Sequence, residues 1–345
     1  MRMAKTAIPK IKDVARVAGV SAATVSRVLN HPETVAEPTR QAVLEATRRT
    51  GYRINLAARN LRRRRTGSIV VLVPNLGNPF FSAILAGIEM TFARHGLNVV
   101  VFDTQQPDVP PELVLEYLHN SRSDGIISLD GGIPETLLKN SGARSSLPPI
   151  IFACEWDANG DYPSVRADNF EGARMAVRHL AALGHRKIGH LQGPPGNVLT
   201  EARRAGMTAA ICELGLELRR EWFLGGSFAL ESGARAAIEW IDLKERPSAL
   251  FCASDQIAFG LISELHRNGV YVPRDLSVIG FDDIDIASRF IPPLTTIRQP
   301  RTQLGAAAAE LLLDHIEGRR DTGEPVREIL PVELVVRGST AQWPQ

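Results

Sequence analysis

The sequence predicts an α/β protein in which a small all-helical head precedes a two-lobed, doubly wound body with parallel sheets. Three observations indicate this fold class. The chain has 345 residues, more than one ordinary hydrophobic core needs. Apolar residues near the N-terminus recur at helical spacing. From residue 68 onward, short apolar runs alternate with amphipathic stretches of helical length, which is typical of strand–helix–strand units.

Charge is divided unequally between these two parts. Residues 1–66 carry a formal charge of +11 and the remainder carries −9, although the whole chain is only +2. A basic head on an acidic body indicates that the head binds a polyanion, with nucleic acid as the first interpretation and a membrane surface as the second. The 44% hydrophobic and 23% charged content is ordinary for a globular protein, which argues against disorder and fibrous repeats.

Residues 11–29 have the periodicity of two short helices separated by a turn. Gly19 interrupts the apolar pattern where a tight turn needs a positive φ, and Ser21 can cap the second helix by accepting from the backbone N–H near Thr24. The pattern predicts a helix-turn-helix, with a generic helical hairpin as the alternative. A third helix is expected from Glu37 onward. The predicted core positions are Ile11, Val14, Ala15, Ala18, Val25, Val28, Leu29, Val43, Leu44 and Ala46.

The second helix has an outward row once its apolar side is packed. This row is Ala22, Ala23, Ser26 and Arg27. A recognition helix presents its N-terminal side chains to base edges. The two alanines suit contact with a thymine methyl group, and Arg27 suits either guanine or a phosphate.

Residues 51–66, GYRINLAARNLRRRRT, follow the third helix. Asn55 can cap a short helix over 56–61, but so short a segment cannot sustain a helix alone. The run Arg62–Arg65 has a simple interpretation as a solvated linker. Because it follows a DNA-reading motif, a phosphate-binding hinge is favoured.

In the body, predicted strands and helices alternate regularly along the chain. We expect strands over 69–73, 97–102, 125–129, 149–153, 187–191, 249–252 and 276–280. We expect helices over 80–95, 111–120, 134–140, 169–183, 200–214, 232–240 and 255–268. Ligands of such sheets bind beyond the carboxyl ends of the strands. Two facing lobes therefore predict a small-molecule cleft between them.

Patterns for catalysis, cofactors and metals do not stand out. Residues 193–196, GPPG, lack the G-x-G-x-x-G spacing, and no Walker sequence, nucleophile elbow or helical H-x-x-x-H pair occurs. The three cysteines, Cys154, Cys212 and Cys252, are scattered in neither a disulfide nor a zinc pattern. We expect no catalytic residues, no metal and no cofactor.

The N-terminal sequence MRMAKTAIPKIKD has no apolar run behind its basic residues, so no secretory signal is expected. No stretch approaches the roughly 18 apolar residues that a membrane helix needs. We expect a cytoplasmic protein with no membrane partner. Two alternative functions are a non-regulatory sugar-binding protein, disfavoured by the head and the missing signal, and a nucleotide-dependent α/β enzyme, disfavoured by the missing phosphate loop.

Residues 11–35, IKDVARVAGVSAATVSRVLNHPETV, followed by 51–63, GYRINLAARNLRR, resemble the LacI/GalR family of bacterial transcriptional regulators. The body continues the resemblance to the family's sugar- and purine-sensing core over 78–89, 165–194, 254–260, 275–283 and 292–300. The stretches ACEW and PPLTTIRQPR are most similar to its cytidine-repressor branch. The resemblance implies a repressor whose operator affinity is controlled by a small-molecule effector, such as a sugar, a nucleoside or a related metabolite.

The resemblance also implies the residues that contact operator DNA. These are Ser21, Ala22, Ala23, Thr24, Ser26, Arg27, Asn30, Tyr52, Asn55, Ala58, Arg59, Leu61 and Arg62. In the family the hinge helix orders only on DNA, and a leucine matching Leu61 wedges into the minor groove and kinks the duplex. Lys10, Ala36 and Ile54 stand where the family commonly has threonine, serine and proline, and these departures weaken helix ends.

The residues that the resemblance implies for the effector are Phe80, Phe81, Glu155, Asn197, Arg203, Phe228, Ser254 and Asp282. Arg203 would donate to hydroxyls or a carboxylate, Asp282 would accept from hydroxyls, and the phenylalanines would stack on rings. Ser254 stands where the family often has asparagine and Glu155 where it often has arginine. The first departure alters the polarity of the pocket, and the second leaves the charge preference for the effector open.

These expectations define three parts of the chain. They are a helix-turn-helix domain (1–54), a hinge helix and linker (55–67), and an effector-binding and dimerisation body (68–345). Within the body, lobe one is expected at about 68–164 and 295–322, and lobe two at about 165–294 and 323–345. The tail STAQWPQ has no leucine heptad, so a homodimer is expected. Operator binding would associate the protein with the nucleoid.

Overall fold

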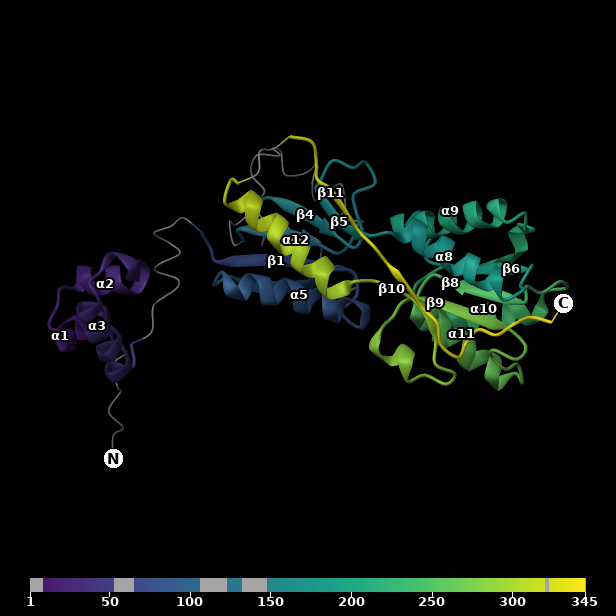
Figure 1. The fold of residues 1–345 in the computed structure, drawn as a ribbon, viewed down its shortest axis with the longest axis horizontal. Coiled ribbons are helices and arrows are strands. Elements are labelled where there is room, and N and C mark those ends of the chain that lie inside the picture. The colour runs from purple at the N-terminus through teal and green to yellow at the C-terminus, as the bar shows by residue number, and fades with distance from the viewer. Residues whose placement is uncertain (1–8, 53–64, 106–122, 132–147, 320–322, 345) are drawn as a thin grey trace, which may run out of the picture. The chain divides into compact units, whose positions relative to one another are not determined.

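The computed structural model describes residues 9–52, 65–105, 123–131, 148–319 and 323–344. The chain divides into two compact units, residues 1–66 and 67–345, which are described separately (Figure 1). The helices predicted over 111–120 and 134–140, and the hinge segment over 56–61, lie outside the described residues. Within the described ranges, no helix is both long and apolar enough to cross a membrane.

The head is a three-helix unit made of α1 (Ile11–Ala18), α2 (Ala22–Asn30) and α3 (Glu37–Thr50), with a 3₁₀ turn, η1 (Pro32–Thr34), before α3. Gly19 ends α1 with φ of 68°, in the left-handed region that favours glycine. The Thr24 amide donates to Ser21 Oγ at 3.0 Å, so the predicted cap of α2 is present. The prediction of a helix-turn-helix is confirmed.

Two details of the predicted head are wrong. Leu44 is 40% exposed, because the face of α3 that packs on α1 and α2 presents Val43 and Ala46 instead. Ala22 is half-buried against the head's core, so it does not belong to the outward row of α2. The first turn of a helix that follows a tight turn lies close to the preceding helix, and small Ala22 fills that contact.

Lobe one is built on a parallel sheet with the order β11-β5-β4-β3-β1-β2. Its strands are β1 (Ser68–Val73), β2 (Asn98–Asp103), β3 (Gly125–Ser128), β4 (Ile150–Ala153), β5 (Ser164–Ala167) and β11 (Arg327–Leu330). The helices α5 (Phe80–Arg94) and α12 (Arg301–Ile316) lie side by side against this sheet (Figure 1). They approach closely because Gly87 and Gly305 face the partner backbone, where a Cβ atom would overlap Thr302 and Ile84.

Lobe two is built on a sheet with the order β12-β10-β9-β8-β6-β7, in which only the short β12 runs antiparallel. Its strands are β6 (Ile188–Gln192), β7 (Phe223–Gly225), β8 (Ala249–Cys252), β9 (Ser277–Asp282), β10 (Thr295–Arg298) and β12 (Glu333–Val335). Its helices are α8 (Asn169–Ala182), α9 (Val198–Glu213), α10 (Leu230–Asp242) and α11 (Asp255–Arg267), with the 3₁₀ turns η2 (Arg220–Trp222) and η3 (Asp285–Ser288). In lobe two, α8 and α9 cover one face of the sheet and α10 and α11 the other (Figure 1). With two mostly parallel sheets, the predicted doubly wound α/β class is confirmed.

The chain crosses between the lobes later than the predicted boundaries near 165, 294 and 323. Strands β5 and β11 belong to the sheet of lobe one, and β10 belongs to the sheet of lobe two, so each crossing follows the end of one of these strands. Neither these three strands nor α12 are among the elements expected from the sequence. The three strands read SVRA, TTIR and REIL, with at most two apolar residues each, so only their pairing with neighbouring strands defines them.

Candidate functional site

One cavity in the body collects all the residues predicted for the effector. Its volume is about 210 Å³, and its walls come from both lobes. The side chains predicted from the sequence that line it are Phe80, Phe81, Glu155, Asn197, Arg203, Phe228, Ser254 and Asp282. Other lining residues were not singled out: Pro74, Asn75, Asn78, Gln105, Asp130, Cys154, Pro194, Leu199, Ser227, Ala229 and Gln256. Most follow the carboxyl end of a strand, so the rule that located the cleft would have found them.

Backbone strain is concentrated at this cavity. Among the described residues other than glycine, three have positive φ: Cys154 at 71°, Asp282 at 124° and Asp283 at 53°. Cys154 and Asp282 line the cavity, and Asp283 directly follows. Such conformations are unfavourable for side-chain-bearing residues and persist where surrounding contacts enforce them, commonly at binding sites.

Arg203 of α9 lines the cavity from lobe two, with its side chain 2% exposed. Nε donates to Asn169 Oδ1 at 2.8 Å, and one terminal nitrogen donates to the Ala253 carbonyl oxygen. The guanidinium carbon lies 3.8 Å from the ring centroid of Phe281. Burial lowers the pKa of Arg203, and the carboxylate of Asp282 opposes this shift. Nε and one terminal nitrogen of Arg203 therefore already donate within the protein, whereas the other terminal nitrogen has, among the described residues, only the ion contact with Asp282.

Asp282 ends β9 beside this arginine. Its Oδ1 lies 4.0 Å from a terminal nitrogen of Arg203 and accepts from Gln299 Nε2 at 2.7 Å. Burial raises the pKa of Asp282 to about 6, although Arg203 and Gln299 favour the charged form.

Asp255 lies behind Asp282 at the start of α11. It accepts from the Ile284 amide at 2.9 Å and from Thr296 Oγ1 at 2.5 Å. Burial and the neighbouring carboxylate of Asp282 raise the pKa of Asp255 well above its ordinary value. Two buried acids thus share the field of one arginine.

Glu155 follows β4 in lobe one and is 6% exposed. Its Oε2 accepts from the Gly131 amide at 2.8 Å, within the same lobe. Its Oε1 accepts from Nδ2 of Asn197 at 2.9 Å, and Asn197 caps α9 in lobe two. Burial raises the pKa of Glu155, and both hydrogen bonds oppose the shift. This side chain therefore links the two lobes directly across the cavity.

The remaining predicted residues divide into apolar walls and a helix cap. Phe80 and Phe81 begin α5 and meet edge to face, with ring centroids 5.1 Å apart. Phe228 lies 5.7 Å from the Arg203 guanidinium. Ser254 Oγ accepts from the Ile257 amide at 3.2 Å and donates to the Phe228 carbonyl oxygen at 3.3 Å. The hydroxyl of Ser254 is therefore used to cap α11.

In the head, the structure exposes part of the predicted DNA-contacting set. Ser21, Ala23 and Arg27 are exposed, whereas Tyr52 packs against the core of the head. Thr24 and Ser26 are half-buried, and the Thr24 hydroxyl contacts Ser21 Oγ at 2.9 Å. Asn55, Ala58, Arg59, Leu61, Arg62 and the side chain of Asn30 lie outside the described residues.

Of the three departures at helix ends, the structure shows a replacement hydrogen bond at one, Lys10. At Lys10, the backbone amide donates to Asp13 Oδ2 at 2.9 Å. Ala36 provides no side-chain cap for α3. Ile54 lies outside the described residues.

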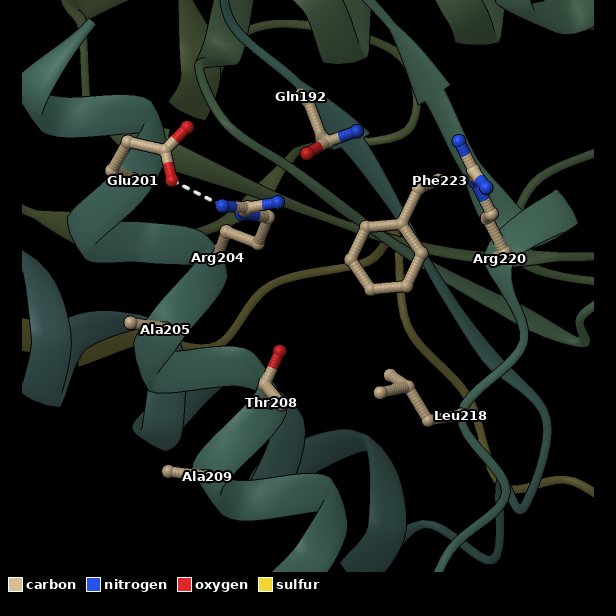
Figure 2. A pocket seen from close by; sticks show the side chains of 9 residues that line it. All are labelled: Gln192, Glu201, Arg204, Ala205, Thr208, Ala209, Leu218, Arg220 and Phe223. Atoms are coloured by element: carbon tan, nitrogen blue, oxygen red, sulfur yellow. Dashed lines mark hydrogen bonds and ion pairs between the residues drawn. The ribbon is translucent and has the colours of Figure 1, made fainter. Parts of the chain in front are cut away.

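A second hollow, of about 1040 Å³, lies on lobe two between α9 and β7 (Figure 2). It includes Arg204, which forms an ion pair with Glu201, together with Phe223 and Arg220. The three residues with strained backbone lie elsewhere, at the cavity between the lobes. Across the described ranges, no group of three His, Cys, Asp or Glu side chains is arranged to hold a metal ion.

A helix-turn-helix head on a two-lobed α/β body, with a cavity where the strand ends of both lobes meet, defines a ligand-controlled DNA-binding protein. Two family models match the chain: bacterial regulatory proteins of the lacI family over residues 10–55, and the periplasmic binding protein-like domain over 177–340. The chain belongs to the lacI family of bacterial regulatory proteins. It is an effector-controlled, DNA-binding transcriptional repressor.

Relatives extend this similarity over almost the whole chain. The HTH-type transcriptional repressor CytR of Escherichia coli K12 is 37% identical over 334 residues, which are 97% of this chain and 97% of the relative. The HTH-type transcriptional repressor PurR of Photobacterium profundum is 38% identical over 95% of this chain and 98% of its own length. The lac repressor dimer bound to operator and the anti-inducer ONPF has a TM-score of 0.81 at 30% identity, covering 96% of this chain and 99% of that one.

Proposed function

We propose that the exposed face of α2 reads the operator and that the cavity between the lobes binds the effector. The assignment of the cavity as the effector site is supported by the positions of the predicted residues. Eight residues chosen from the sequence, spread from Phe80 to Asp282, converge on a single cavity that also has strained backbone. For the first part, Arg27 and Ala23 are exposed on α2, where base edges are read in this motif.

The contacts around Asp283 supply a route from the cavity to the lobe crossing. Arg298 Nε donates to Asp283 Oδ2, and a terminal nitrogen of Arg337 donates to Oδ1, both at 2.7 Å. Arg301 begins α12 of lobe one and donates to the Asp283 carbonyl oxygen at 3.1 Å. An effector that contacts Asp282 would therefore act through Asp283 on Arg298 and Arg301, which flank the crossing from β10 to α12, and so would change how the lobes close.

We also propose that the protein acts as a homodimer in the cytoplasm. Two copies would bind a near-palindromic operator, since paired heads related by a two-fold axis require paired half-sites. The protein would act in the cytoplasm, where the DNA lies, and without catalysis. The assignment of Leu61 as a minor-groove wedge lies outside the described residues and stays a prediction from the sequence.

A mobility shift with the full chain tests this function. A selection from random duplexes supplies the site, and affinity for that site is compared with affinity for scrambled DNA at one fixed salt concentration. We expect specific binding to exceed non-specific binding by roughly 10³-fold or more. A metabolite library screened by thermal shift should contain a ligand that raises Tm and changes operator affinity. A chain that binds every duplex equally would contradict the proposal.

A further inference from the structure

The described wall of the cavity is acidic. Asp130, Glu155 and Asp282 contribute carboxyl groups, and Arg203 is the one basic side chain among the described lining residues. Of Arg203's nitrogens, Nε and one terminal nitrogen donate to protein oxygens, and the other terminal nitrogen faces Asp282. On the described wall, three carboxyl groups therefore face a single guanidinium, which Asp282 already offsets, so this part of the cavity favours a ligand without negative charge.

Glu155 is the acceptor that a ligand can reach by exchange. Its bond from the Gly131 amide lies within lobe one, whereas its bond from Asn197 crosses to lobe two. The Asn197 carboxamide is separately held, because its Oδ1 accepts from the Leu199 amide at 2.9 Å. The Nδ2 group of Asn197 can therefore separate from Glu155 while Oδ1 of Asn197 still caps α9. A ligand N–H or O–H group can then occupy the position, but an anionic group cannot, since it would face a carboxylate at contact distance.

The volume of the cavity and its aromatic wall further restrict which ligands can fit. The cavity volume of about 210 Å³ is below the ~300–1,000 Å³ typical of ligand pockets. Phe80, Phe81 and Phe228 supply ring faces and edges on its wall. This combination suits a small ligand of one or two ring systems with a few polar substituents.

We propose that Glu155 is the specificity-determining residue of this cavity and selects an uncharged or cationic ligand of monosaccharide to nucleoside size. The ligand donates a hydrogen bond to Glu155 Oε1 in place of Asn197, and phosphorylated counterparts are rejected. This inference rests on the proposed effector site. The hydrogen bond that the ligand replaces, between Glu155 and Asn197, joins the two lobes. Binding at Glu155 would therefore both select the charge of the ligand and remove a contact between the lobes.

Calorimetric titration of the full chain with matched ligands tests the inference. The sets share one ring and differ in charge: D-ribose and D-ribose 5-phosphate; D-glucose, D-glucosamine and D-glucose 6-phosphate; adenosine and cytidine with their 5′-monophosphates. We expect at least one uncharged or cationic member to bind, at least roughly tenfold more tightly than its phosphorylated counterpart. Glu155→Gln should reduce this preference, and Glu155→Arg should reverse it.

Glu201→Gln is the matched control. Glu201 is an exposed carboxylate of α9 that pairs with Arg204 in the second hollow, between α9 and β7 (Figure 2). It should keep the wild-type ranking. If Glu155→Arg does not fold, the nearly isosteric Glu155→Gln still decides the outcome, through the ratio of the two dissociation constants.

Three results would overturn the inference. They are tighter binding of a phosphorylated member to the wild-type chain, an unchanged ranking in Glu155→Gln, and no binding of any uncharged or cationic member. The operator shift separates these failures from failure of the proposed function. A chain that binds its operator specifically but shows any of the three results is a regulator with another ligand class, whereas a chain without specific DNA binding refutes the function itself.

Discussion

The head and the cavity of the body use polar residues in opposite ways. In α1–α3 the polar contacts are local: Ser21 caps Thr24, and Arg16, Arg40 and Arg48 each pair with an acid three residues away. In the body, Arg203 reaches Asn169 and Ala253, which are 34 and 50 residues away, from a fully buried position. The head thus keeps side chains such as Arg27 exposed to a partner in solvent, whereas the cavity fixes its charges before any ligand arrives.

The largest effect should come from the buried side of this comparison. Arg203→Ala removes the cation between Asp282 and Asn169 and leaves buried carboxyl groups without it, so unfolding free energy should fall by about 3–5 kcal/mol. Chemical denaturation of the full chain measures this. Arg204→Ala, on the exposed side of the same helix, should cost roughly 0–1 kcal/mol. Equal stability of the two variants would show that Arg203 is not a structural centre.

In the head, the expected loss is in binding and not in stability. Arg27→Ala should weaken specific operator binding by about 1–3 kcal/mol if the guanidinium makes a bidentate base contact. If it contacts only phosphate, specific and non-specific binding should fall together and the salt slope should shrink by roughly one. Titrations at several salt concentrations separate these results. Arg16→Ala, at the exposed ion pair with Asp13 in α1, is the control, and unchanged binding by Arg27→Ala would remove that residue from the interface.

A smaller effect concerns local folding of the head. Ser21→Ala removes the acceptor for the Thr24 amide, which should cost about 1 kcal/mol. Hydrogen exchange at the α2 amides should accelerate while exchange in the body stays unchanged. Ser21→Asp retains an acceptor and should restore protection. Faster exchange in both units would mean that the cap is not a local feature.

At neutral pH the smallest effect involves the proton of Asp282. Its pKa is raised to about 6 in the folded protein by burial, so the folded state holds this proton more tightly than the unfolded chain does. The resulting stabilisation is fully present below the unfolded pKa of about 4 and is lost as pH rises through 6. Asp282→Asn should remove this dependence from denaturation curves taken between pH 4 and 7. An identical pH profile in the variant would exclude Asp282 as the titrating group.

Features that depend on neighbours along the chain can be predicted from the sequence. Gly19, the Ser21 cap and the spacing of Val14, Val25 and Val28 predict the head, because helices and tight turns are held by contacts three to five residues apart. Alternating strands and helices also predict where a cavity must lie, since parallel strands present their carboxyl ends on one side. Family likeness then selected the residues that line it.

Only the tertiary structure decided how those residues are used. It showed that Nε and one terminal nitrogen of Arg203 donate within the protein, that Ser254 serves as a cap, and that Glu155 reaches across to Asn197. It also assigned β5, β10 and β11 to their sheets and moved the lobe crossings. These facts depend on partners that are distant in sequence. The residue type determines whether a group can donate or accept a hydrogen bond, but only tertiary packing determines which partner lies within about 3 Å.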